Sequence, residues 1–447
     1  MTDISLEPWL GTSPSLTGCP EGDVQVLAQY VQCGEALLKR LGTRGERSGE
    51  QAARAECVHA ACRGLRRRFM ASHAAWVYSL LTKDFTVRRS LREVAFAAAE
   101  SCPGLVPTET QIAQERTRLQ CDKEGYEIDQ GILFQALLRS QQIGTHIIET
   151  ALQPTPRALG LIEAFRRAGR VNLGSVVIER QGCAAHLTIN NAYCLNAEDD
   201  GLVDDLETAV DLALLDGEVW VGVLRGGFMT HPRYAGRRVF SAGINLKALH
   251  AGQISFVDFL LRRELGYISK IVRGLRVDPE MAAASSLRGH QELVEKPWLA
   301  AVDSFAIGGG AQLLLVFDRV IAAADSYFSL PAAQEGIVPG FSNLRLTRLL
   351  GSRKSRQVIL FGRKIWAHDP DAHLLFDEVV DSPEIEAAIE RNVQQLSSPA
   401  VVANRHMLNL ADESPHSFLR YAAEFSWIQA ERLYSQDVLA KTGRTIQ

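Results

Sequence analysis

The chain has 447 residues, of which 46% are hydrophobic, 22% charged and 7% aromatic. That length predicts two or more folded units, and the composition is typical of globular proteins and excludes a disordered or fibrous chain. The formal net charge of −4 leaves no basic excess to hold nucleic acid or an anionic membrane. A small-molecule partner is therefore favoured.

The cysteines argue against a metal or disulfide framework. All 8 lie in the first 194 residues, and none forms a CxxC pair. Cys57 and Cys62 flank His59, but helix packing is the preferred interpretation over metal ligation, so we expect no metal site. Reduced thiols are typical of a cytoplasmic protein. The opening segment lacks a basic stretch followed by an apolar one, and no apolar run of about 18 residues occurs, so we predict neither secretion nor membrane insertion.

Apolar residues at helical spacing predict helices through the first third of the chain. The expected helices span residues 23–42, 51–81, 86–100, 108–120 and 128–151. Asp23 is the expected N-cap of the first helix and Gly42 its stop. Arg66, Arg67 and Arg68 are expected on a solvated helix face rather than at a phosphate site.

The pattern changes near residue 172, after Pro154 and Pro156 interrupt the helical run. Strands are expected at 176–178, 186–189, 219–224, 299–303 and 320–323, and helices at 201–216, 310–317 and 343–350. Alternating strands and helices are typical of an α/β domain built from crossover units. We therefore expect a helical domain over residues 1–172 and an α/β domain over 173–447.

Two glycine-bearing turns each follow an expected strand and open a helix. They are FSAGINL, residues 240–246, and AIGGGAQ, residues 306–312. Either turn alone is more often a packing feature. Together they supply the backbone amides of Ile244 and Gly309, two donors that could converge on one oxygen. A developing enolate requires fixed donors of that kind, at a helix N-terminus and away from water.

Three stretches resemble the crotonase (enoyl-CoA hydratase/isomerase) superfamily in order and spacing, over about residues 175–440. They are FSAGINLKAL, KPWLAAVDSFAIGGGAQLLLVFDRVIAAADSYFSLP and EGIVPGFSNLRLTRLLG. The resemblance implies an α/β fold with a crotonase-like core of ββα units, here preceded by an all-helical N-terminal domain. It also implies binding of acyl-CoA thioesters, with the thioester carbonyl polarised by the amides of Ile244 and Gly309.

The same resemblance implies CoA contacts, which come from a loop before the first turn. The residues are Ala192, Cys194, Leu195 and Asn196, the last three beside the adenine. Lys247 and Arg432 are candidates for the CoA phosphates, with a solvated surface role as the alternative.

Two positions depart from the hydratases of that superfamily. Those enzymes carry one glutamate two residues after the triple glycine and a second directly after the proline of the next segment, where this chain has Gln312 and Ala332. A glutamine amide neither takes nor gives a proton at neutral pH, and alanine has no acid–base group, so water addition by paired glutamates is not expected. Glu335 could substitute, but a structural role is preferred for it.

One branch of the superfamily is similar to nearly the whole chain, namely the cofactor-independent (3,5-dihydroxyphenyl)acetyl-CoA 1,2-dioxygenases of glycopeptide-antibiotic pathways. The similarity lies in the helical extension, the phrases HPRYAGRRVFSAGINL and RRELGYISKIVRG, and the glutamine after the triple glycine. By position, the similarity implies that the amides of Ile244 and Gly309 form an oxyanion hole. It also implies substrate contacts from Glu198, His231, Arg263 and Gln312.

Each polar candidate has an alternative role. Glu198 could instead belong to a helix N-cap region with Asp199 and Asp200. Arg262 and Arg263 are adjacent and face different ways on a helix, so only one is expected in a cleft. His231 is open between the active-site wall and a CoA contact.

The chemistry that the resemblance implies needs no metal, flavin or other cofactor. An arylacetyl thioester has an α-carbon acidified by both ring and carbonyl, and its enolate can pass an electron to dioxygen. The resulting α-peroxide attacks the thioester and yields an α-keto acid and CoA. The alternatives are a non-oxidative thioesterase or isomerase of the superfamily, and a non-catalytic acyl-CoA-binding scaffold.

Relatives of this kind assemble as homotrimers or dimers of trimers, which is the expected oligomer. The C-terminal stretch 425–439 has the aromatic and apolar content to reach a neighbouring subunit, including Phe425, Trp427, Ile428, Leu433 and Tyr434.

Overall fold

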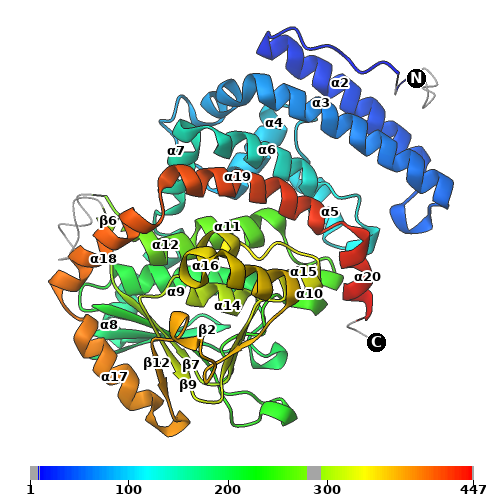
Figure 1. Ribbon diagram of the computed structural model, residues 1–447. Coiled ribbons are helices and arrows are strands. Elements are labelled where there is room, and N and C mark those ends of the chain that lie inside the picture. The colour runs from blue at the N-terminus through cyan, green and yellow to red at the C-terminus, as the bar shows by residue number, and fades with distance from the viewer. Residues whose placement is uncertain (1–8, 10, 279–292, 445–447) are drawn as a thin grey trace. The chain divides into compact units, whose positions relative to one another are not determined.

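The computed structural model describes residue 9, residues 11–278 and residues 293–444 (Figure 1). The chain forms two compact units. Unit 1 comprises Met1–Thr150, Lys247–Asp258 and Leu419–Gln447, and unit 2 comprises Ala151–Leu246 and Phe259–Phe418. Across the described ranges, no helix is both long and apolar enough to cross a membrane.

Unit 1 is built from helices. They are α2 (Pro20–Arg40), α3 (Gly49–Thr82), α4 (Leu91–Ser101), α5 (Glu109–Glu115), α6 (Glu127–Arg139), α7 (Gln141–Ala151), α10 (Leu246–His250), α19 (Pro415–Arg432) and α20 (Gln436–Arg444). Helices α7 and α10 each extend one residue beyond the bounds of the unit, and α19 extends four. The starts of α3, α4 and α5 are fixed by capping boxes, in which Ser48, Ser90 and Thr108 each exchange hydrogen bonds with the third residue of the helix. Unit 1 is therefore helical, as predicted, and the caps fix the residue at which each of these three helices starts.

Several predictions about unit 1 are wrong in detail. Asp23 is not the N-cap, because α2 begins at Pro20 and the fully buried Asp23 carboxylate instead accepts from the amides of Thr17 and Gly18 and pairs with His73. The helix expected over 128–151 is broken, since Ser140 adopts an extended conformation between α6 and α7.

The arginine cluster is likewise not wholly solvated. Arg66 is 4% exposed and pairs with Asp129 at 3.0 Å. Its neighbour Arg67 is half-exposed and lies over the Trp427 ring, so only part of the cluster faces water.

The described residues of unit 2 form three sheets. Its strands are β1 (Arg170–Asn172), β2 (Val176–Gln181), β3 (Ala184–Ile189), β4 (Val221–Gly226), β5 (Leu275–Arg276), β6 (Leu293–Val294), β7 (Trp298–Val302), β8 (Phe305–Ile307), β9 (Arg319–Ala323), β10 (Tyr327–Ser329), β11 (Ile365–Trp366) and β12 (Glu378–Val380). The main sheet has the order β1-β2-β3-β4-β7-β9-β12, antiparallel up to β3 and parallel from β3 onward. A second sheet has the order β11-β10-β8, and β5 pairs with β6.

Helices of unit 2 alternate with these strands, as crossover units require. They are α8 (Pro156–Ala168), α9 (Asp200–Leu215), α11 (Arg262–Leu265), α12 (Tyr267–Arg273), α14 (Gly309–Leu314), α15 (Ala332–Glu335), α16 (Ser342–Phe361), α17 (Ile385–Leu396) and α18 (Pro399–Asp412). Figure 1 shows α17 beside the sheet. The central strands are almost fully buried, and Ile385 and Ile389 of α17 pack against them. The predicted α/β class is confirmed, and the predicted elements keep their type with bounds shifted by a few residues, except that α16 runs on to Phe361. The sequence did not predict the short strands β1, β5, β6, β8, β10, β11 and β12 or the helices α11, α12, α15, α17 and α18.

Close packing inside the sheet explains one glycine. A Cβ on Gly222 would lie 2.2 Å from the ring of Trp298, a side chain with no exposed surface on the neighbouring strand. Only glycine leaves room for that indole, which fills the core beneath β4 and β7.

Candidate functional site

The two glycine turns lie directly against each other in unit 2. Ser241 and Ala306 form an isolated parallel bridge, so the chain runs side by side through both turns. Gly243 has a φ of +90°, and a Cβ there would be 3.5 Å from the backbone nitrogen of Gly309. The sequence placed these turns far apart, and the fold brings their backbones together.

The amides of Ile244 and Gly309 are both available to a ligand. Neither finds an acceptor among the residues that the structure describes. Gly309 is the first residue of α14, where an amide has no intrahelical partner, so its N–H also lies at the positive end of that short helix. Two unsatisfied donors on adjoining turns are suited to bind one oxygen atom.

Each glycine of the triple glycine meets a different neighbour. Gly308 has a φ of +53° and lies against the backbone of Gly243. A Cβ on Gly309 would be 2.6 Å from a carboxylate oxygen of Glu198, and one on Gly310 would be 2.5 Å from the Cβ of Ser241. Three independent close approaches therefore require three glycines in a row.

Arg263 is the centre of a polar group beside the turns. Its Nε and Nη2 donate to the two oxygens of Glu198 at 2.5 and 3.1 Å. Nη1 donates to the side-chain oxygen of Gln312 at 2.8 Å and to Glu264 at 2.9 Å, and Nη2 also donates to the carbonyl of Gly309 at 2.7 Å. The guanidinium thus joins the side chains of Glu198 and Gln312 to the backbone of the second turn.

The group is buried and remains ionised at its centre. Arg263 is 3% exposed, and its neighbours Glu198 and Glu264 are 1% and 2% exposed. Burial disfavours the charged guanidinium, but the nearby carboxylates outweigh that cost, so the pKa of Arg263 is raised above its ordinary value. Burial raises the pKa of Glu264 and raises that of the Tyr267 phenol still further.

Gln312 keeps a donor free. Its side-chain oxygen is taken by Arg263, which fixes the orientation of the amide. Within the described part of the chain, its NH2 group has no acceptor. The half-buried glutamine therefore presents two N–H bonds, a suitable partner for a hydroxyl oxygen.

Two alternatives left open by the sequence are decided by the contacts. Asp199, not Glu198, caps α9 by accepting from the amide of Leu202 at 3.1 Å. Arg262 turns away from Arg263 and donates to Glu207 at 2.6 Å. Glu198 and Arg263 are therefore the members of each pair that join the candidate site.

The predicted CoA loop has mostly internal contacts. Leu195 and Asn196 both have a φ of +56°. Asn196 is fully buried, accepts from the amide of Asn191 and donates to the carbonyl of Val239, so its side chain holds the loop. The Cys194 thiol also bonds within the loop, and Ala192 opens it.

Three predicted contacts are not joined to the Arg263 group. His231 is exposed and caps the short 3-10 helix Pro232–Tyr234, accepting from the amide of Arg233 at 3.2 Å. Lys247 and Arg432 belong to unit 1, where Lys247 is exposed and Arg432 pairs with Asp437. Their roles toward CoA stay predictions.

The hydratase positions carry no acid. Ala332 is buried at the start of α15, directly after Pro331. Glu335 ends the same short helix, and no contact among the described residues links it to Arg263. In the same part of the chain, no group of three His, Cys, Asp or Glu side chains is arranged to hold a metal ion.

Sequence reasoning missed Glu264 and Gly340. Adjacent residues on a regular helix face apart, so nothing in the sequence suggested that Glu264 would contact Arg263. Gly340 has a φ of +47°, and a Cβ there would be 2.0 Å from Glu264 and 2.4 Å from Gln312. The glycine in the phrase VPGF was the available signal, because it marks a close approach of backbone to a site.

These features define a crotonase-like α/β protein with an added helical unit. The family model for enoyl-CoA hydratase/isomerase matches residues 283–417. The (3,5-dihydroxyphenyl)acetyl-CoA 1,2-dioxygenase of Amycolatopsis orientalis is 52% identical over 431 residues, which covers 96% of this chain and 98% of that protein. The chain therefore belongs to the enoyl-CoA hydratase/isomerase (crotonase) superfamily.

More distant relatives match only part of the chain. The short-chain-enoyl-CoA hydratase of Clostridium acetobutylicum is 28% identical over 235 residues, covering 52% of this chain and 79% of that enzyme. The crystal structure of an enoyl-CoA hydratase/isomerase from Pseudoalteromonas atlantica covers 61% of this chain and 96% of that protein, with 22% identity and a TM-score of 0.47.

Proposed function

We propose that the chain is a dioxygenase that converts (3,5-dihydroxyphenyl)acetyl-CoA and O2 to 3,5-dihydroxyphenylglyoxylate and CoA. The observation that carries the proposal is the 52% identity to a dioxygenase of that name along 96% of this chain, helical unit included. The reaction uses no metal and no organic cofactor, and it serves an aromatic amino-acid or antibiotic pathway.

In this proposal the two turns form the oxyanion hole. The amides of Ile244 and Gly309 bind the thioester oxygen and stabilise the enolate that forms when the α-proton leaves. The NH2 of Gln312 and the ion pair of Glu198 with Arg263 orient the two ring hydroxyls. Support comes from the adjoining unsatisfied amides and from the free donors of Gln312.

The chemistry then balances without an external redox partner. The enolate gives one electron to O2, and superoxide recombines with the α-carbon radical to form a C–O bond. The α-peroxide attacks the thioester carbonyl and expels CoA thiolate. The O–O bond breaks as the second α-proton leaves, so the α-carbon becomes a ketone while the former carbonyl becomes a carboxylate. Both atoms of O2 end in the α-keto acid, and CoA takes up a proton.

The test is oxygen uptake by purified, chelator-treated protein supplied with (3,5-dihydroxyphenyl)acetyl-CoA. We expect one O2 consumed and one CoA released per thioester, with label from 18O2 in the α-keto acid. CoA release at an equal rate without oxygen would identify a thioesterase instead. An isomerised product would identify an isomerase, and binding without turnover would identify a scaffold.

A homotrimer, or a dimer of trimers, completes this proposal. Support comes from α18, on which Met407, Leu408 and Leu410 are 63%, 69% and 55% exposed, because neighbouring exposed apolar side chains can mark an interaction surface. Sedimentation velocity of the wild-type protein and of a Leu408→Glu variant tests it, and an unchanged monomer in both would contradict it.

A further inference from the structure

The two halves of the candidate site are joined by a segment that belongs to the other unit. Ile244 lies just before residues Lys247–Asp258 and Arg263 just after them. Those twelve or so intervening residues, which we name the connecting segment, pack within unit 1, whereas the residues on both sides of them pack within unit 2. Whatever fixes the connecting segment therefore acts on the chain that carries both groups.

Unit 1 holds the connecting segment through its backbone. The amide of Phe256 donates to the Oε1 of Glu127 at 2.7 Å, a carboxylate that is 4% exposed on α6. The carbonyl of Gln253 accepts from Arg116 at 3.2 Å. Gly252 has a φ of +71°, and a Cβ there would be 2.1 Å from the carbonyl oxygen of Arg118.

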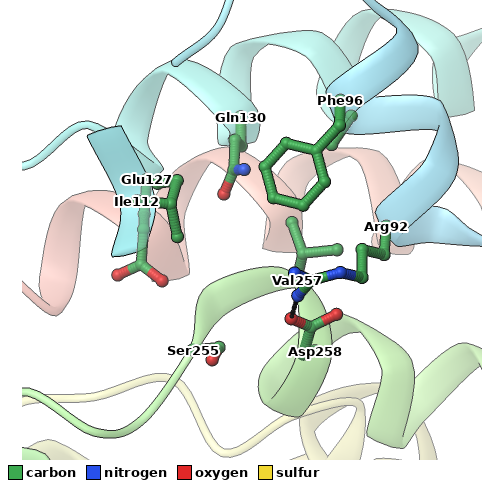
Figure 2. A pocket seen from close by; sticks show the side chains of 9 residues that line it. Arg92, Phe96, Ile112, Glu127, Gln130, Ser255, Val257 and Asp258 are labelled. Carbon is green, nitrogen blue, oxygen red and sulfur yellow. Dashed lines mark hydrogen bonds and ion pairs between the residues drawn. The ribbon is translucent and has the colours of Figure 1, made fainter. Parts of the chain in front are cut away.

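A second attachment is an ion pair at the end of the segment. Arg92 of α4 donates to Asp258 at 2.6 Å through Nη1 and to Glu109 at 2.5 Å through Nη2 (Figure 2). Side chains of this pair are 47% and 23% exposed, so it is a weaker attachment than the buried Glu127.

The segment borders a small cavity. Figure 2 shows side chains that line it, among them Phe96 of α4, Gln130 of α6 and Val257 of the segment. The space inside is about 10 Å³, room for no more than about one water molecule.

The attachment at Glu127 coincides with the start of a π-helix. Phe256–Leu261 is π-helical and runs directly into α11, whose second residue is Arg263. A π-helical turn contains an extra residue that rotates everything after it, and such turns recur at functional sites. The amide that Glu127 fixes therefore belongs to the first residue of the turn that sets the direction of the Arg263 side chain.

We propose that Glu127 is a positioning residue for the candidate site: by fixing the amide of Phe256, it sets the start of the π-helical turn that leads to Arg263. The inference rests on the proposed function only in the choice of substrate. Under this inference a residue of the helical extension takes part in positioning the site. An acyl-CoA enzyme without such an extension would have to position the corresponding residues with other contacts.

The test compares three variants that separate the two oxygens of Glu127. Oε2 of that carboxylate accepts from the Tyr434 hydroxyl at 2.5 Å, so Tyr434→Phe removes a partner of Glu127 and leaves the bond to Phe256. Glu127→Ala removes both bonds, and Glu127→Gln keeps an acceptor for Phe256. The readouts are kcat and KM for oxygen uptake, α-hydrogen exchange of the arylacetyl-CoA in D2O under argon, and hydrogen–deuterium exchange of the peptide covering residues 250–261.

Glu127→Ala should lower kcat and the α-exchange rate about tenfold or more, a barrier increase of about 1.4 kcal/mol, with KM nearly unchanged. Its 250–261 peptide should exchange faster. Tyr434→Phe should stay within about twofold of wild type, and Glu127→Gln should recover most of the loss. Equal losses in Glu127→Ala and Tyr434→Phe, or faster peptide exchange with unchanged rates, would overturn the proposal.

Should Glu127→Ala fail to fold, Arg92→Gln replaces it, with Glu109→Gln as the matched control that leaves the bond to Asp258. A lower α-exchange rate in Arg92→Gln alone supports positioning, and equal rates in both variants refute it. Should the wild-type protein take up no oxygen, the proposed function fails, while α-exchange and peptide exchange still decide the role of Glu127.

Discussion

Arg263→Lys tests whether the candidate site needs the planar guanidinium or only a positive charge. Arg263 makes five hydrogen bonds, to Glu198 twice, to Glu264, to Gln312 and to the Gly309 carbonyl. An ammonium group has three N–H bonds and no fork that matches a carboxylate. The substitution therefore keeps the charge and loses at least two bonds.

The size of the effect follows from those two bonds. A hydrogen bond to a charged partner contributes about 1.5–3 kcal/mol, so the loss is about 3 kcal/mol or more. Because Arg263 forms these bonds within the protein itself, we expect this loss in the free energy of unfolding of unit 2. Turnover should also fall, by about 10²-fold, since Gln312 and the turn at Gly309 both lose a partner that fixes their orientation.

The assay pairs urea unfolding with oxygen uptake and α-hydrogen exchange, all measured where the variant remains folded. The matched control is Arg262→Lys, because Arg262 donates to Glu207 and Asp204 and not to the site. We expect the control to lose stability and to keep kcat within about threefold of wild type. A folded Arg263→Lys protein with wild-type kcat, or an equal loss of kcat in both variants, would refute the reasoning.

Two further variants follow from the contacts. Gln312→Glu removes the free NH2 and adds a third carboxylate beside Arg263, after Glu198 and Glu264, so KM for the dihydroxyphenyl substrate should rise about tenfold. Crotonyl-CoA hydration should stay absent because Ala332 supplies no partner acid, and hydration by this variant would contradict that. Burial raises the pKa of Glu413, but the charges of Arg345 and Arg273 outweigh burial and lower that pKa from 4.5 to about 2. Its contribution, about 3 kcal/mol, is present above pH 4.5 and lost as the pH falls toward 2. Urea midpoints of wild type and Glu413→Gln should therefore differ most at pH 7 and converge below pH 3, and a constant difference would show that the charge is not the cause.

The elements that periodicity predicted have the expected type, and periodicity failed where a local break or a distant partner decides the structure. Leu133 and Leu137, like Ile143 and Ile147, are four residues apart, but the step from Leu137 to Ile143 is six residues and crosses the polar residues 139–142, which is where α6 ends and α7 begins. Asp23 looks like a cap because it is an acid before an apolar run. Its partner His73 is 50 residues away, and only the fold shows that the pair is buried.

The C-terminal aromatic residues illustrate the same limit. Phe425 and Leu433 are 3% and 0% exposed inside unit 1, whereas Ile428 is 42% exposed, so only part of this stretch is left to meet a neighbouring subunit, and that contact stays a prediction. A Cβ on Gly131 would be 2.7 Å from the carbonyl of Ser426, which shows how closely α19 approaches α6. The helical unit thus takes residues from three stretches of the chain. A single boundary near residue 172 cannot describe a unit that is assembled in this way.

Side-chain chemistry and backbone chemistry leave different traces in a sequence. Gln312 and Ala332 show that the acid–base pair of the hydratases is absent, because acid–base catalysis depends on the type of side chain and the sequence shows that type directly. A backbone N–H is the same in every residue but proline, so the donors at Ile244 and Gly309 leave no residue type to find. What remains visible is the glycine that each close approach requires. Gly243 and Gly308 have φ of +90° and +53°, a conformation that residues with side chains rarely adopt, and a Cβ on either would be 3.1–3.2 Å from the other turn. A chain can therefore keep the geometry of the two turns while its catalytic acids change. In such a chain the glycines, and not the acids, indicate where the backbone donors lie.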